Sequence, residues 1–267
     1  MKKLLGLGLG LLLLVGCGGA KDDATKLSVS ATSVPHAEIL EQIKPQLKEE
    51  NIDLEIVVVD DYFIPNKAVA NGDVDANFFQ HIPFLNEQIK DHKYKIENAG
   101  NIHIEPIGIY SKTYKNKSEI KDGATVVLSN SVADHGRILS ILEKAGLIEL
   151  DKKVDKINAK VKDIVKNKKN LVFKADVDPA FAAKAYENNE GDLVAINGNF
   201  ALNAGIKPLE EAIILEDSEN NPYVNIVVTQ EGKKDDENIK KLVAALKSED
   251  TQKFILDKYK GSVIIAK

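Results

Sequence analysis

The chain has 267 residues, of which 43% are hydrophobic and 29% are charged, and its formal net charge is −5. This size and composition are typical of a globular protein with one large domain or two ordinary ones. The acidic balance argues against non-specific binding to nucleic acid, which depends on clustered basic residues.

The first 16 residues have the features of a secretory signal peptide. Lys2 and Lys3 precede an apolar run at residues 4–15, and Gly16 follows the run. A helix of this run is too short to cross a bilayer core of roughly 30 Å. We therefore predict a signal peptide at residues 1–16 and no transmembrane helix there.

Cys17 is the only cysteine, and it ends a segment that looks like a bacterial lipobox. Residues 14–17 read Leu-Val-Gly-Cys, and such a cysteine becomes the lipidated first residue of the mature protein. The small and charged residues that follow predict a flexible tether at residues 17–25. We expect a palmitate-type anchor on the extracytoplasmic face of the cell membrane, because two acyl chains suffice for stable attachment. The alternative is an ordinary signal peptide that happens to contain a cysteine.

The rest of the chain alternates between strand and helix patterns. Alternating or short apolar runs predict strands at residues 26–31, 53–59, 74–79, 124–128, 161–165, 171–173, 192–196 and 224–228. Apolar residues three or four positions apart predict helices after Pro35, Pro83 and Ser131, and a last helix at residues 236–259. The repeated strand–helix order predicts an α/β fold with largely parallel sheets.

Two extended segments are candidates for crossings between two lobes. Residues 102–110 contain Pro106, which argues against a plain central strand, and a proline also precedes the last predicted strand. We predict that lobe 1 comprises residues 26–107 and 226–267, and that lobe 2 comprises residues 108–225. Ligands of such sheets bind beyond the carboxyl ends of the strands, which here would face a cleft between the lobes.

No motif of a known catalytic class is present. The chain has no Gly-x-Ser-x-Gly elbow and no phosphate-binding Gly-x-x-x-x-Gly-Lys loop. Its five histidines form no His-x-x-x-His pair, so we expect no metal and no cofactor. A buried metal site assembled from distant residues is the alternative. We also expect no enzymatic activity, with a hydrolase that uses Asp61, His81 or His135 in the cleft as the alternative.

Arg137 is the only arginine of the chain, and it lies in the first turns of the helix predicted after Ser131. A helix N-terminus favours an anion, and the planar guanidinium matches a carboxylate. The residue type and its place therefore favour binding of the carboxylate of an amino acid. A surface or salt-bridging arginine is the alternative.

An ordered series of segments resembles the methionine-binding lipoprotein family (NlpA/MetQ type), whose members are binding proteins of ABC importers. The segments are residues 35–40, 61–62, 65–66, 71–81, 83–85, 103–106, 108–111, 136–137, 144–147, 195–199, 201–202 and 222–226. The resemblance implies a two-lobed fold like that of type II periplasmic binding proteins, with the ligand in the cleft between the lobes. It also implies that the chain captures methionine and hands it to a membrane permease and an ATPase.

The resemblance further implies a ligand site of seven residues: Tyr62, Phe79, His81, Phe84, Arg137, Asn197 and Asn225. The arginine would pair with the ligand carboxylate, and the two asparagines would bind its amino and carboxylate groups. The aromatic residues and the histidine would surround the ligand side chain, which suits a thioether. The alternatives are core positions for the phenylalanines, a structural histidine, a surface tyrosine, and turn or strand-end asparagines.

The sequence departs from the family pattern just before its arginine. Ser131, Val132, Asp134 and His135 stand where an Asp-Pro pair, a second Asn and often Glu are expected, and Phe84 stands where tyrosine is frequent. These positions affect the identity of the ligand more than the class of protein. We expect L-methionine, with D-methionine, a methionine dipeptide or another small amino acid as alternatives. A surface adhesin is the alternative from another class.

Overall fold

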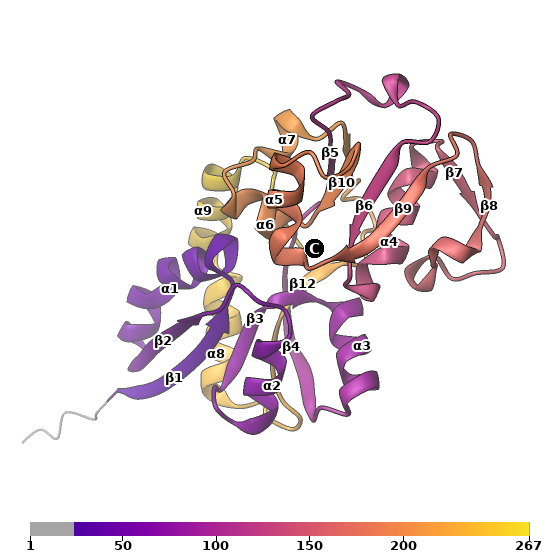
Figure 1. Ribbon diagram of the computed structural model, residues 1–267. Coiled ribbons are helices and arrows are strands. Elements are labelled where there is room, and N and C mark those ends of the chain that lie inside the picture. The colour runs from indigo at the N-terminus through magenta and orange to yellow at the C-terminus, as the bar shows by residue number, and fades with distance from the viewer. Residues whose placement is uncertain (1–23, 267) are drawn as a thin grey trace, which may run out of the picture.

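The computed structural model describes residues 24–266 and has two lobes, each built around one β-sheet (Figure 1). The predicted signal peptide, Cys17 and most of the tether lie outside the described residues. Within residues 24–266, no helix combines the length and the apolar character needed to cross a membrane. The prediction of a two-lobed α/β fold is confirmed.

The first sheet has six strands within the described residues. In order across the sheet they are β13 (Ile264–Ile265), β4 (Ile96–Ile104), β12 (Val224–Gln230), β3 (Ala76–His81), β1 (Thr25–Ala31) and β2 (Ile52–Val58). β1 is parallel to β2 and β3, whereas β12 is antiparallel to β3 and β4, and β13 is antiparallel to β4. Our prediction of largely parallel sheets is therefore wrong for this sheet. The reason is that β4 leads toward the second lobe and β12 returns from it.

The second sheet has five strands within the described residues. They are β11 (Ile214–Leu215), β5 (Gly108–Tyr110), β10 (Leu193–Ile196), β6 (Thr125–Ser129) and β9 (Val172–Val177). β6 is parallel to β10 and β9, and β5 is antiparallel to β10 and β11. A separate antiparallel pair consists of β7 (Ile148–Leu150) and β8 (Ile164–Asn167).

The helices cover the two sheets (Figure 1). The first lobe carries η1 (Ser33–Ala37), α1 (Glu38–Glu49), α2 (Ile64–Asn71), α3 (Ile82–His92), α8 (Glu237–Leu246) and α9 (Glu249–Tyr259). The second lobe carries η2 (Lys117–Glu119), α4 (Val132–Lys144), η3 (Lys156–Asn158), η4 (Val161–Asp163), η5 (Pro179–Phe181), α5 (Ala182–Glu187), α6 (Gly198–Asn203) and α7 (Pro208–Glu211). The last two helices of the chain thus return to the lobe in which the described chain begins.

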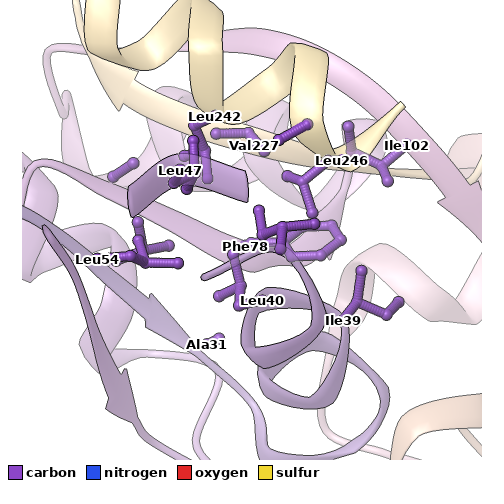
Figure 2. Close-up of a cluster of buried hydrophobic side chains, with 14 of the residues drawn as sticks. Ala31, Ile39, Leu40, Leu47, Leu54, Phe78, Ile102, Val227, Leu242 and Leu246 are labelled. Atoms are coloured by element: carbon purple, nitrogen blue, oxygen red, sulfur yellow. The ribbon is translucent and has the colours of Figure 1, made fainter. Parts of the chain in front are cut away.

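The core of the first lobe joins segments from both ends of the chain. Leu40 and Leu47 of α1 pack with Phe78 of β3, and Leu242 and Leu246 of α8 belong to the same cluster (Figure 2). All five side chains are at most 1% exposed. The helices present these residues on one face because apolar side chains recur every three or four positions. The first lobe is therefore completed only by the C-terminal segment.

Most predicted strands are confirmed with bounds that shift by a few residues, but other segments differ. Residues 161–165 are not one strand, because Asp163 closes a 3₁₀ turn before β8 begins. The helix predicted at residues 236–259 is two helices, since the Ser248 hydroxyl accepts the N–H of Thr251 and begins α9. The short helix α2 was not among the predicted elements, because two turns give no clear periodicity.

α4 lies very close to the loop that contains η3. A Cβ atom placed on Gly136 would collide with the backbone carbonyl oxygens of Lys156 and Ile157. Backbone atoms cannot turn aside as the end of a flexible side chain can. The absence of a side chain at this position therefore sets how closely α4, and with it Arg137, packs against the neighbouring loop.

We expect Gly136→Ala to lower the free energy of unfolding by about 1–3 kcal/mol, as overpacking of a close contact generally does. In a helix with open space on this side, the same change would raise the free energy of unfolding by roughly 0.5–1 kcal/mol. The sign of the change therefore shows whether α4 packs closely against the loop. Urea denaturation followed by circular dichroism measures it. Val132→Ala, at an exposed position of the same helix, is the control. A Gly136→Ala variant as stable as the wild type would contradict the close packing.

Candidate functional site

A cavity lies between the two lobes, and the space between its walls is about 350 Å³, which includes space open to solvent. Its lining residues come from both lobes: Tyr62, Phe79, Gln80, His81, Phe84, Glu105, Arg137, Asn197, Gly198, Asn199 and Asn225. All seven residues of the predicted ligand site are in this set. The structure thus brings together residues that are far apart in the sequence, while their individual roles stay predictions.

β3 and α3 place three of the seven predicted ligand residues at the cavity. Every residue of β3 is buried, Phe79 and His81 lie at its carboxyl end, and Phe84 lies in the first turn of α3. The backbone N–H of Phe84 donates to His81 Nδ1 at 3.1 Å, so the histidine caps the helix. A strand that ends in a helix start thus directs these side chains to the edge of the sheet where ligands bind.

Three aromatic rings form one part of the cavity wall. The centroid of Tyr62 lies 5.9 Å from that of Phe79 and 5.8 Å from that of Phe84, and the two phenylalanines are 6.0 Å apart. Both phenylalanines are almost fully buried and also line the cavity. Each is therefore a core residue and part of the cavity wall at once. The Tyr62 hydroxyl donates to Asn199 Oδ1 at 2.6 Å, which connects the first lobe to the second.

Arg137 is buried in α4 and binds protein groups on one side. Its Nε and Nη2 donate to the carboxylate of Glu216 at 2.8 and 2.6 Å, and Nη2 also donates to the backbone oxygen of Glu105 at 2.7 Å. The guanidinium lies over the ring of Tyr223, 4.5 Å from its centroid. Arg137 thus forms a salt bridge with Glu216, and its predicted pairing with a ligand carboxylate stays a prediction. Nη1 has no hydrogen-bond partner among residues 24–266, which leaves its two N–H groups available.

Asp134 connects lining residues of both lobes. Its Oδ1 accepts a hydrogen bond from His81 Nε2 at 3.0 Å, and its Oδ2 accepts one from Asn197 Nδ2 at 3.0 Å. Burial raises the pKa of Asp134, but the hydrogen bond from His81, together with Arg137 and Asn197, outweighs burial and lowers this pKa to about 2. The ionised carboxylate therefore holds one lining residue from each lobe in a fixed orientation.

A second buried network lies on the first-lobe side of the cavity. Asn225 of β12 pairs in register with His81 of β3 and with His103 of β4. His103 Nε2 donates to Glu105 Oε1 at 2.6 Å. His36 Nε2 lies 3.2 Å from Glu105 Oε1 and 3.2 Å from Asn225 Oδ1. The network thus connects two lining residues, a glutamate and an asparagine, to two histidines that do not line the cavity.

Burial dominates the protonation of this network. It lowers the pKa of His103 to about 3, and it lowers the pKa of His36 to about 4 although the charge of Glu105 opposes it. Burial also raises the pKa of Glu105, although the nearby ring of His36 and the guanidinium of Arg137 oppose this shift. Both histidines are therefore neutral at pH 7, and the carboxyl group between them is poorly solvated.

His36, His103 and Glu105 also form the only cluster among the described residues with donor types and spacing suited to a metal ion. Their candidate donor atoms lie within 4.8 Å of one another. The hydrogen bond from His103 to Glu105, and that from His36 to Asn225, account for this close approach without an ion. The expected absence of a metal stays a prediction.

The residues of the hydrolase alternative are not assembled for catalysis. The carboxylate of Asp61 accepts backbone N–H groups at the start of α2, and His135 Nε2 donates to the carbonyl oxygen of Ser129. Neither residue lines the cavity that His81 lines. Asp61, His81 and His135 therefore do not come together at this cavity, as the hydrolase alternative requires.

Residues outside the predicted set complete the site: Gln80, Glu105, Gly198 and Asn199 line the cavity, and Asp134 orients two lining residues. The first four belong to segments that carry the family resemblance, and Asp134 is one of the departures from the family pattern. A signal was therefore present for each of them. Sequence position did not indicate that their side chains meet at one cavity.

Comparisons with known proteins place the chain among lipoproteins. A family model for NlpA lipoproteins matches residues 27–267. The methionine-binding lipoprotein MetQ of Bacillus subtilis is 48% identical over 99% of this chain and 98% of its own length. The D-methionine-binding lipoprotein MetQ of Escherichia coli is 35% identical over 96% of this chain and 94% of its own length. The resemblance predicted from the sequence is confirmed.

Solved structures share the fold over nearly the whole described chain. A methionine-binding lipoprotein of Bacillus subtilis has a TM-score of 0.89 at 49% identity and covers 91% of this chain and 98% of its own. A nutrient-binding protein of Burkholderia cenocepacia, solved with methionine bound, has a TM-score of 0.85 at 34% identity. The match covers 90% of this chain and 100% of the Burkholderia chain. These matches identify the two-lobed fold as that of periplasmic binding proteins.

We expect the free energy of unfolding to decrease as the pH falls from about 6.5 toward 4. The rings of His36 and His103 bind protons near pH 6.5 in the unfolded chain but only near pH 4 and 3 in the folded protein. Between these values the unfolded state binds more protons, so the stability present above pH 6.5 is lost, at up to about 1.4 kcal/mol per pH unit for each ring.

Urea denaturation at pH 7, 6, 5 and 4 measures this dependence. His103→Gln should flatten the slope, because glutamine does not titrate, and His92→Gln at an exposed position is the control. Equal slopes for the wild type and His103→Gln would contradict the role of burial at this histidine.

Proposed function

The chain belongs to the NlpA lipoprotein family, and from this we propose that it is an extracytoplasmic binding lipoprotein that captures L-methionine and delivers it to an ABC importer. The proposal rests above all on the single cavity that all seven predicted ligand residues line. These residues come from both lobes, so a ligand bound there contacts both sides of the cleft. Binding and closure of the cleft would then be one event.

The polar groups around the cavity suit an α-amino acid. Arg137 keeps its Nη1 group free and would pair with the ligand carboxylate. The Oδ1 atom of Asn225 is engaged by His36, so its amide nitrogen would donate to the same carboxylate. The amide nitrogen of Asn197 is engaged by Asp134, so its Oδ1 would accept the ligand ammonium. A zwitterion uses both kinds of group.

The aromatic wall suits the side chain of methionine. Tyr62, Phe79 and Phe84 offer ring edges and faces to a flexible thioether, and sulfur–aromatic contacts contribute roughly 0.3–1.5 kcal/mol each. His81 adjoins this wall, with its centroid 6.2 Å from that of Phe84. The relatives named above bind methionine or D-methionine, and this supports the same choice for this chain.

Hydrogen bonds across the cleft support a mechanism of capture by closure. His81 meets Asp134, Tyr62 meets Asn199, and the Ser33 hydroxyl donates to Asn203 Oδ1 at 3.1 Å. Binding would favour the closed arrangement, and the transporter would favour release by opening it.

We place the lobe limits at residues 26–107 with 226–267 for lobe 1 and at residues 108–225 for lobe 2.

Lipidation of Cys17 would hold the protein at the outer face of the cell membrane, next to a permease and an ATPase. The NlpA lipoprotein family model matches residues 27–267 of the chain. This match begins ten residues after Cys17. The segment between would act as a flexible tether. Two acyl chains on the cysteine would make the attachment stable.

We expect tight binding of L-methionine by the processed chain, residues 17–267, that carries Cys17→Ser to avoid the lipid. The protein is unfolded and refolded to remove bound ligand, and amino acids are titrated by calorimetry because the chain has no tryptophan. The panel holds L- and D-methionine, glycyl-methionine, cysteine, glutamine and leucine. Preference for D-methionine or glycyl-methionine would keep the class and correct the ligand. Binding to no amino acid would overturn the proposal.

We expect Arg137→Ala to weaken methionine binding by about 2–5 kcal/mol, because the ligand carboxylate would be buried without its partner. The variant also leaves Glu216 unpaired. The free energy of unfolding of the variant must therefore be measured together with its affinity for methionine. The double variant Arg137→Ala/Glu216→Gln removes that complication and should bind as weakly. Unchanged affinity in a folded double variant would exclude the anchoring role.

A further inference from the structure

We propose that Glu105 binds the α-ammonium group of the ligand, and that His36 and His103 position its carboxylate for this purpose. The inference rests on the proposed amino-acid ligand and extends it, because it assigns a residue to the recognition of a free amino group. No residue of the predicted ligand site carries a negative charge.

Glu105 occupies the first crossing between the lobes, between β4 and β5. It is 5% exposed and lines the cavity together with Arg137 and Asn225. A Cβ placed on Gly198 would lie 2.8 Å from Glu105 Cβ and 3.4 Å from Glu105 Oε2. The second lobe thus approaches this side chain closely and shields its carboxylate from bulk water.

The two histidines orient the carboxyl group of Glu105 and bring no positive charge to it. His103 Nε2 donates to Glu105 Oε1 at 2.6 Å, and His36 Nε2, which hydrogen-bonds Asn225 Oδ1, lies 3.2 Å from the same carboxylate oxygen. Thr32 Oγ1 lies 2.7 Å from His36 Nδ1, so the hydroxyl can donate there and keep the ring proton on Nε2. Because burial keeps both rings neutral at pH 7, they supply hydrogen bonds and no positive charge.

No other cation among the described residues pairs with this carboxylate. The guanidinium of Arg137 pairs with Glu216 and reaches only the backbone oxygen of Glu105. A buried carboxylate without a cationic partner is unfavourable, and a ligand ammonium that enters the cavity would supply the missing charge. The close approach of Arg137 to Glu105 also puts an anion site beside a cation site, as the two groups on one α-carbon require.

This arrangement makes a free α-amino acid the preferred class of ligand. An N-acylated amino acid would bury Glu105 against an uncharged amide. A dipeptide separates its ammonium and carboxylate by an extra residue, so it could not satisfy Glu105 and Arg137 in the same way. The aromatic wall would then choose among free amino acids by side chain.

Glu105→Gln tests the proposal, because it removes the charge and keeps the size of the side chain. The affinities of the Cys17→Ser protein with and without Glu105→Gln are compared for three ligands. These are L-methionine, L-methioninol, which lacks the carboxylate, and 4-(methylthio)butanoate, which lacks the ammonium. We expect the variant to lower the affinity for methionine and for methioninol by about 10- to 100-fold. The affinity for 4-(methylthio)butanoate should stay within about threefold, since this compound has no ammonium to lose.

A second pair of variants keeps the test decisive if Glu105→Gln folds poorly. His103→Leu removes the hydrogen-bond donor to Glu105 and should lower the affinity for methionine more than the affinity for 4-(methylthio)butanoate. His103→Gln, whose amide can donate near the position of Nε2, should recover most of that loss. Glu97→Gln, at the other end of the same strand and bonded to the backbone of Gly232, is the control and should change none of the three affinities.

Equal weakening of all three ligands, or unchanged methionine binding, would overturn the role of Glu105 while the proposed function stands. A wild-type protein that binds no amino acid would instead overturn the proposed function itself. The two failures are therefore distinguished by the wild-type titration.

Discussion

The strands that connect the two lobes also form the polar side of the candidate site. β4 and β12 pair with each other in the first sheet, next to β3 (Figure 1). Because β4 leads toward the second lobe and β12 returns from it, the connectivity requires their antiparallel pairing. Glu105 and Asn225 stand where these strands meet the cleft. The hinge and the site therefore share one piece of backbone, and closure of the lobes acts directly on the groups that would hold the ligand.

Buried charge ties this hinge to the second lobe. Asp134 is held by His81 and Asn197, and Glu216 is held by Arg137, so both carboxylates are satisfied within the protein. Such groups are costly to bury unless they are paired and hydrogen-bonded, and the bond between His81 and Asp134 restricts how the two lobes can meet. The aromatic wall adds apolar contact without any such directional demand. Orientation of the ligand would come from the charges, and discrimination among side chains from the rings.

Much of the fold and the composition of the site could be predicted from the sequence. The alternation of strand and helix patterns indicates an α/β chain, and the ordered family segments contain all eleven lining residues. What escapes prediction is pairing over distance. Arg137 and Glu216 are 79 positions apart, and His81 and Asp134 are 53 apart. No local pattern relates such residues, so only the structure shows that Arg137 pairs with Glu216.

The sequence by itself determined the elements and the chemical groups at hand, because periodicity, helix caps and turn residues act over a few positions. Only the tertiary structure decided the direction of β12, the break before Ser248 that divides the last helical segment, and the assembly of one cavity from both lobes. It also decided the charge state of His36 and His103, which burial keeps neutral beside Glu105. The physical reason is that burial and the distances between remote residues exist only once the chain has crossed between the lobes and returned.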